Sequence, residues 1–150
     1  MLRLSKLTDY AVVVLAGLDR AERHSRVMAV PEIALGSGLA EPTVAKVLKI
    51  LGQAGLVQGL RGAHGGYRLD RPLHDIPLSE VIVAFDGPIA LTACVDGAVG
   101  ICEAEAMCPV RGRWDPVNTA IRDALAKVTV ADLAGTSCCK TTPTPALITA

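Results

Sequence analysis

The stretch that most limits the possible folds of this chain runs from residue 30 to residue 69. It begins with a short helix that has Pro31 in its first turn, and residues 36–38 (Gly-Ser-Gly) stop that helix. A second helix starts near Glu41 and ends at Gly55, and apolar residues at spacings of three and four give it one buried face: Val44, Val47, Leu48 and Leu51. Two short helices joined by a tight glycine turn indicate a helix-turn-helix, although any helical hairpin looks similar.

The residues after the second helix make this interpretation more specific. Two strand-like runs, 56–61 and 67–69, flank a glycine-rich tip at 62–66. A hairpin placed here, with Arg61 and Arg68 at its base, is typical of a wing, since glycines permit close approach to a phosphate backbone and arginines supply charge. An ordinary surface hairpin stays the alternative, and a nucleotide-binding P-loop is disfavoured because no Gly-Lys-Ser/Thr follows. We therefore predict a mainly α fold with a small β-hairpin, a winged helix-turn-helix over residues 1–73.

Charge and periodicity support a nucleic-acid-binding front half. Residues 1–73 carry ten lysines and arginines against six aspartates and glutamates, whereas residues 74–150 carry five against nine. A basic half joined to an acidic half fits a nucleic-acid-binding module joined to another unit.

A further amphipathic helix, capped by Ser5 or Thr8, is predicted near the start of the chain from the stripe Leu4, Leu7, Ala11, Val14, Leu15 and Leu18.

Three of the five cysteines, Cys94, Cys102 and Cys108, fall within fifteen residues at the spacing C-x7-C-x5-C. Zinc sites usually show paired C-x2–4-C knuckles and four ligands, which this stretch lacks. Disulfides suit an oxidising compartment, but residues 1–6 do not resemble the start of a signal peptide. Thiolates hold iron–sulfur clusters, and Pro109 after the last cysteine is a feature of such sites. The spacing favours a cluster and leaves structural zinc, a disulfide with a spare thiol, and coincidence open.

The remaining residues predict a second unit over 74–134 and a disordered tail over 135–150. Residues 72–77 read as a linker, and residues 78–85 read as a helix. A long helix begins at Asp115-Pro116, and its apolar stripe predicts a partner helix, most simply a second copy, or packing onto the winged helix: Trp114, Val117, Ile121, Leu125 and Val128. The tail holds Cys138 and Cys139, whose role stays open. No apolar run is long enough for a transmembrane helix, so we expect a cytoplasmic protein.

The order winged helix, linker, three cysteines and long helix resembles the Rrf-two superfamily of bacterial transcription regulators. The resemblance covers about residues 1–134, and it is carried by the cysteine triplet and three motifs: Leu4-Ser-Lys-Leu-Thr-Asp-Tyr-Ala11, Ala54-Gly-Leu-Val57 and Arg61-Gly-x-x-Gly65-Gly-Tyr67. Its members include IscR-like regulators of iron–sulfur assembly, NsrR-like nitric-oxide sensors and RirA-like iron-responsive repressors. Residues 41–49 and 108–114 look most like the regulators of the SUF iron–sulfur assembly operon.

This resemblance implies a homodimer that binds a palindromic DNA operator and carries one iron–sulfur cluster per subunit on the three cysteines. A 4Fe–4S cluster is the first expectation and 2Fe–2S the second. IscR-like proteins take a histidine three residues past the last cysteine, where this chain has Arg111. NsrR-like proteins use an aspartate near the start of the first helix of the other subunit, and Asp9 occupies that place. The alternative for Asp9 is a carboxylate that the helix dipole favours.

Together, these observations predict a regulator that senses an iron–sulfur cluster, binds DNA and represses cluster-assembly genes. The alternative is a zinc-stabilised or nitric-oxide-sensing winged-helix regulator. An enzyme is not expected, because no Cys–His pair suggests a nucleophile. The residues expected at DNA are Glu41, Thr43 and Lys46 on base edges, Lys49, Arg61 and Arg68 on phosphates, and His64 at the wing tip.

Overall fold

The computed structural model describes residues 3–22, 27–95, 102–103 and 107–135. Their elements follow the order α1 (Lys6–Glu22), α2 (Val30–Ser37), α3 (Glu41–Gln53), β1 (Val57–Leu60), β2 (Gly66–Leu69), the 3-10 turn η1 (Leu73–Asp75), α4 (Leu78–Asp86), α5 (Asp115–Lys127) and α6 (Val130–Ala134). The two strands form one antiparallel hairpin. The predicted fold class, mainly α with a small β-hairpin, is confirmed.

Helix α1 is the centre of the core, and it contacts α2, α3, α4, α6 and β2. Most of the two predicted stripes is buried: Ala11, Val14, Leu15 and Leu18 on α1, and Val44, Val47, Leu48 and Leu51 on α3, whereas Leu7 is half-buried. Each buried valine or leucine contributes about 1.5–3 kcal/mol relative to an exposed one, so these two faces fix the helix pair. Leu4 of the predicted α1 stripe is exposed because it precedes the first helical residue.

The start of α1 is tied to the end of α4. Ser5 precedes the helix, and its hydroxyl accepts a hydrogen bond from the Thr8 backbone N–H (3.3 Å). Of the two predicted caps, Ser5 therefore satisfies this backbone donor. Thr8 lies inside the helix and is buried, and its hydroxyl donates to the carboxylate of Asp86, the last residue of α4. The Ser5 backbone N–H donates to the same oxygen at 3.3 Å.

The predicted linker at residues 72–77 is a structured joint. It contains η1, and its Leu73 and Ile76 side chains are buried in the core. After α5 the chain returns beside this joint, where the Val130 N–H donates to the Ile76 carbonyl (2.9 Å) and the Leu78 N–H donates to the Val128 carbonyl (2.8 Å). These bonds hold the end of α5 against the start of α4.

Helix α6, which the sequence interpretation did not include, completes the core by burying Val130 against α1. Thr129 and Asp132 form a capping box at its start: the Thr129 hydroxyl accepts from the Asp132 N–H, and the Asp132 carboxylate accepts from the Thr129 N–H and hydroxyl. These bonds to the charged carboxylate lower the pKa of Asp132.

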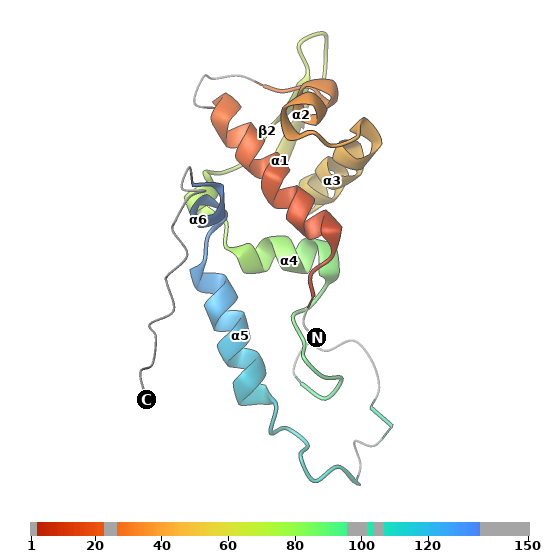
Figure 1. Ribbon diagram of the computed structural model, residues 1–150, viewed down its shortest axis with the longest axis vertical. Helices are drawn as coiled ribbons and strands as arrows, with labels where there is room; N and C mark the ends of the chain where they lie inside the picture. Colours follow the sequence, from red (N-terminus) through yellow and green to blue (C-terminus); the bar gives the residue numbers. More distant parts are fainter. Residues whose placement is uncertain (1–2, 23–26, 96–101, 104–106, 136–150) are drawn as a thin grey trace, which may run out of the picture.

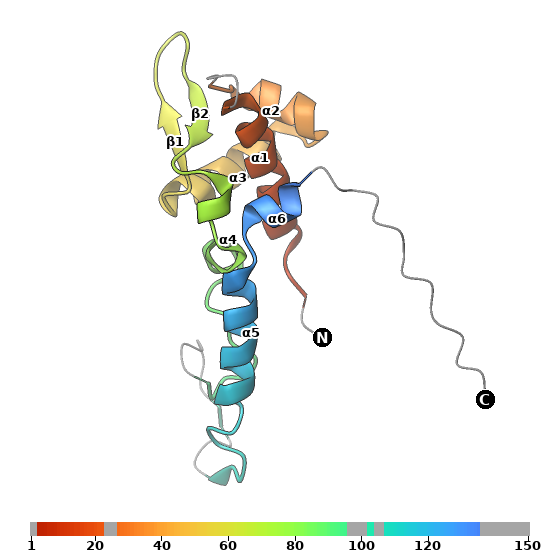
Figure 2. The same ribbon diagram turned by 90° about the vertical axis from the view of Figure 1, so that its left-hand side faces the viewer.

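Figures 1 and 2 show an elongated molecule, with the hairpin at one end and α5 extending from the helical body toward the other. The segment that follows α4 extends toward the same end of the molecule as α5, which returns from that end to the helical body (Figure 1). In the part of the chain described here, no helix has the length and apolar character needed to cross a membrane.

Candidate DNA interface and cysteine loop

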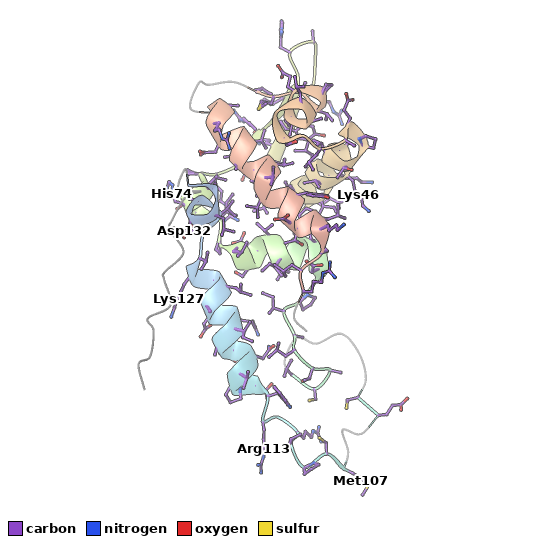
Figure 3. The ribbon with its side chains drawn as sticks, viewed as in Figure 1. Lys46, His74, Met107, Arg113, Lys127 and Asp132 are labelled. Carbon is purple, nitrogen blue, oxygen red and sulfur yellow. The ribbon has the colours of Figure 1, made fainter. Side chains whose placement is uncertain are left out.

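Helix α3 presents its basic side chains opposite its buried stripe. Lys46 and Lys49 are exposed, and Lys46 projects outward from the helix in Figure 3. Glu41 is exposed in the first turn, where the helix dipole favours a carboxylate, and Thr43 is half-buried at the edge of the stripe. The second helix of a helix-turn-helix reads the major groove with such outward residues.

The hairpin carries the three other predicted DNA contacts. Arg61 and His64 are exposed in the loop between the two strands. Figure 2 shows this loop at the end of the molecule opposite α5. Arg68 stands opposite Gln58 in the strand register, and its Nε and Nη2 donate to Gln58 Oε1 at 3.1 and 2.7 Å. Arg68 is exposed, so this pairing orients its guanidinium along the hairpin surface and leaves other N–H donors for a phosphate.

Two glycines permit close backbone approaches in the wing, Gly65 within the hairpin loop and Gly66 against the segment before α2. Met28 and Tyr67 exchange two backbone hydrogen bonds, of 3.1 and 2.8 Å. A Cβ built on Gly66 would lie 2.5 Å from the Met28 carbonyl oxygen, and one on Gly65 would lie 2.5 Å from the Leu60 carbonyl oxygen. Side chains therefore do not fit at either position, and Gly66 sets where the wing stands relative to the segment before α2.

The three predicted cysteine ligands lie between α4 and α5. Cys94, Cys102 and Cys108 are half-buried and carry free thiols. Within the described residues, no three side chains of the His, Cys, Asp and Glu types are grouped so that they could hold a metal ion. The donor chemistry fits an iron–sulfur cluster, since free thiolates are its usual ligands, and the chain would have to draw the sulfur atoms together on binding. Residues 96–101 and 104–106, and the predicted tail with Cys138 and Cys139, lie outside the described residues.

Asp9, the predicted fourth ligand, is exposed in the first turn of α1. It follows Thr8, whose hydroxyl bonds to Asp86 at the root of the cysteine loop. The structure thus places the start of α1 beside the end of α4, as Figure 1 shows, but it does not group Asp9 with the described cysteines of the same chain.

Sequence reasoning missed Asn118, the contact that ties the cysteine loop to α5. Its side chain is buried, its Oδ1 accepts from the Leu91 N–H (3.0 Å), and its Nδ2 donates to the Ile89 carbonyl (3.2 Å). No spacing pattern marks this residue. The missed capping box before α6 did have a signal, because Thr129-x-x-Asp132 matches the known sequence signature.

The profile of a family described as iron-dependent transcriptional regulators, Rrf2, matches residues 4–136. The chain belongs to the Rrf2 family. It is 30% identical over 132 residues to the HTH-type transcriptional regulator NsrR of Bacillus subtilis, covering 88% of this chain and 90% of that protein. It is 31% identical over 134 residues to the HTH-type transcriptional regulator IscR of Vibrio campbellii, covering 88% and 77%. Among solved structures, CymR, the global cysteine regulator of B. subtilis, superposes with a TM-score of 0.68 at 28% identity, covering 89% and 97%.

Membership of the Rrf2 family settles the coarse assignment. The likeness to solved Rrf2-type regulators confirms the winged-helix fold, and the relatives are named as transcriptional regulators. The protein is therefore a DNA-binding transcriptional regulator and not an enzyme, as the sequence predicted.

Proposed function

We propose that this Rrf2-family protein binds an iron–sulfur cluster through Cys94, Cys102 and Cys108. It represses iron–sulfur assembly genes, and the presence or loss of the cluster controls this repression. The observation that carries the proposal is the set of three free, half-buried thiols on one loop of a chain whose family is described as iron-dependent. A thiolate-bound cluster would supply redox and iron sensitivity. The loop leaves α4 beside the start of α1 and returns into α5, so its shape bears on both helices.

Asp9 is the fourth ligand in this proposal, and it comes from the partner subunit. Its exposure on the first turn of α1 supports this role, because an exposed carboxylate is available to a second chain. Carboxylate oxygen is a harder ligand than thiolate, so the iron it holds would be the one most easily lost. We favour a 4Fe–4S cluster over 2Fe–2S.

The DNA-bound form in this proposal is a homodimer on a palindromic operator. Trp114 and Val117 at the start of α5 are 42% and 45% exposed, which supports α5 as the apolar face for a second copy. Glu41, Thr43 and Lys46 would then meet base edges, and Lys49, Arg61, His64 and Arg68 would meet the backbone. Because dimers read half-sites one helical turn apart, a change in the cysteine loop that shifts α5 would alter the fit of the two wings.

Anaerobic purification tests the cofactor directly. We expect brown protein with iron and sulfide in nearly equal amounts, and we expect Cys102→Ala to lose both. Colourless protein with stoichiometric zinc, which iron and sulfide cannot reconstitute, would establish the zinc-stabilised alternative. Protein without metal that still binds its operator would instead place the chain with regulators that work without a cluster.

The role of Asp9 is tested by the lifetime of the cluster. Asp9→Ala should lose iron faster than wild type on exposure to air or nitric oxide, followed by absorbance. Asp123→Ala is the matched control, because it removes an exposed carboxylate from α5. An Asp9→Ala cluster that decays at the wild-type rate would remove Asp9 from the ligand set.

A further inference from the structure

One buried side chain joins α5 to the segment that carries Cys94. Asn118 is 2% exposed and is, with Thr8, one of two buried polar residues among those described. Its amide oxygen accepts from the Leu91 N–H, and its amide nitrogen donates to the Ile89 carbonyl. The side chain therefore satisfies the two backbone groups that flank Ala90, as a neighbouring strand would.

Cys94 lies between the residues that Asn118 binds and the buried residue Val95. Leu91 precedes it by three residues, and the next residue after it, Val95, is buried. The Thr92 hydroxyl lies 3.3 Å from the Cys94 sulfur, within hydrogen-bonding distance. By contrast, Met107 beside Cys108 is 92% exposed, and in Figure 3 it lies at the far tip of the loop. Of these two cysteines, Cys94 is the one with a buried neighbour and with a hydroxyl group within hydrogen-bonding distance.

We propose that Asn118 is a positioning residue, which holds Cys94 in place for metal binding and couples Cys94 to α5. This inference rests on the proposed cluster function. A primary amide whose donor and acceptor are both satisfied by one backbone segment fixes that segment's position. A ligand that is already in place loses less conformational freedom when it binds a metal. Asn118 belongs to α5, so a displacement of Cys94 when a metal binds or leaves is transmitted to this helix, which carries the exposed Val117 and is preceded by the exposed Trp114.

The test uses three variants of the full chain. Asn118→Ala removes both hydrogen bonds. Asn118→Asp keeps an acceptor for the Leu91 N–H and loses the donor to the Ile89 carbonyl. Thr119→Ala is the control, since it changes the next residue of α5, which is exposed. Hydrogen–deuterium exchange of the Leu91 amide in metal-free protein reports the contact without any cluster. Thiol alkylation of Cys94, compared with Cys108, reports its position.

We expect the Leu91 amide to exchange roughly thirtyfold faster in Asn118→Ala, the shift given by losing two typical hydrogen bonds, and to change little in Thr119→Ala. Asn118→Asp should also exchange faster than wild type, because its buried carboxylate faces the Ile89 carbonyl oxygen and repels it. Alkylation of Cys94 should rise in Asn118→Ala while alkylation of Cys108 stays constant. After anaerobic reconstitution, Asn118→Ala should lose iron several-fold faster than Thr119→Ala.

The outcomes separate this inference from the cluster proposal. Unchanged exchange and alkylation in Asn118→Ala would overturn the positioning role, even if wild type holds a cluster. Altered exchange and alkylation in a protein that never takes up iron and sulfide would support the contact while refuting the cluster. If Asn118→Ala does not fold, wild type decides: a Leu91 amide that exchanges as fast as a free loop amide contradicts the contact.

Discussion

Replacing Gly66 by alanine should destabilise the protein through one identifiable clash. The added Cβ would lie 2.5 Å from the Met28 carbonyl oxygen, 2.7 Å from the Met28 carbonyl carbon and 2.9 Å from Val27 Cγ1. Two of these three atoms are backbone, so the chain at Met28 has to move. Moving it separates Met28 from Tyr67 and weakens the two backbone hydrogen bonds that fasten the wing to the segment before α2.

The expected loss follows from these contacts. Two backbone hydrogen bonds contribute about 1–3 kcal/mol together, and overpacking adds about 1–3 kcal/mol. Alanine restricts the unfolded chain and returns about 0.4–1 kcal/mol, so the net fall in the free energy of unfolding lies between about 1 and 6 kcal/mol and centres near 3 kcal/mol. For a chain of this size the melting temperature should fall by on the order of 10 °C.

Urea unfolding of metal-free protein, followed by circular dichroism, measures this effect. Gly17→Ala is the control: Gly17 lies in α1 and a Cβ there meets no atom within 4 Å. It should stabilise the protein by about 0.5–1 kcal/mol, because alanine favours a helix. Both substitutions replace glycine by alanine, but one is expected to lower the free energy of unfolding and the other to raise it. If Gly66→Ala unfolds within 0.5 kcal/mol of wild type, as surface changes do, the close approach to Met28 is wrong.

Three further predictions concern DNA binding, the α1–α4 contact and acid stability. Arg61→Ala should make the plot of log affinity against log salt concentration less steep by about 0.9, as for one lost phosphate contact. Arg122→Ala on α5 should leave the slope unchanged. If Arg61→Ala has the wild-type slope, Arg61 lies outside the interface. Thr8→Val should cost about 1–3 kcal/mol, since it removes the buried hydroxyl that donates to the α4 carboxylate, and exposed Thr119→Val should cost little; equal melting temperatures would contradict that contact. The lowered pKa of Asp132 means that its capping contribution is full above its ordinary value of 3.8 and is lost as pH falls through the lower, folded value. The stability difference between wild type and Asp132→Ala should therefore narrow in acid, and a difference that is constant with pH would refute this origin.

The sequence by itself determined helices α1 to α5, the wing and the family. Apolar residues at helical spacing identified the buried faces of α1 and α3. Such a stripe has to be buried against some other part of the protein, and the spacing shows this without showing which part. The glycine-rich tip between two strand-like runs identified the hairpin, and Pro116 after Asp115 placed the start of α5. These signals are local, so each can be read without knowing the rest of the fold. The cysteine spacing likewise predicted thiol chemistry in the segment between α4 and α5, which stays a prediction.

Only the tertiary structure decided how the loop is anchored. Asn118 bonds to residues 27 and 29 positions away, and Thr8 bonds to a carboxylate 78 positions away. The return of α6 onto α1 and the seat of Gly66 against Met28 are equally long-range in origin. A polar side chain in a helix looks solvent-exposed in the sequence unless its partner is known, and the partner is chosen by the packing of the whole core. Local patterns specify which faces are buried, whereas the pairing of buried polar groups depends on which segments that burial brings together.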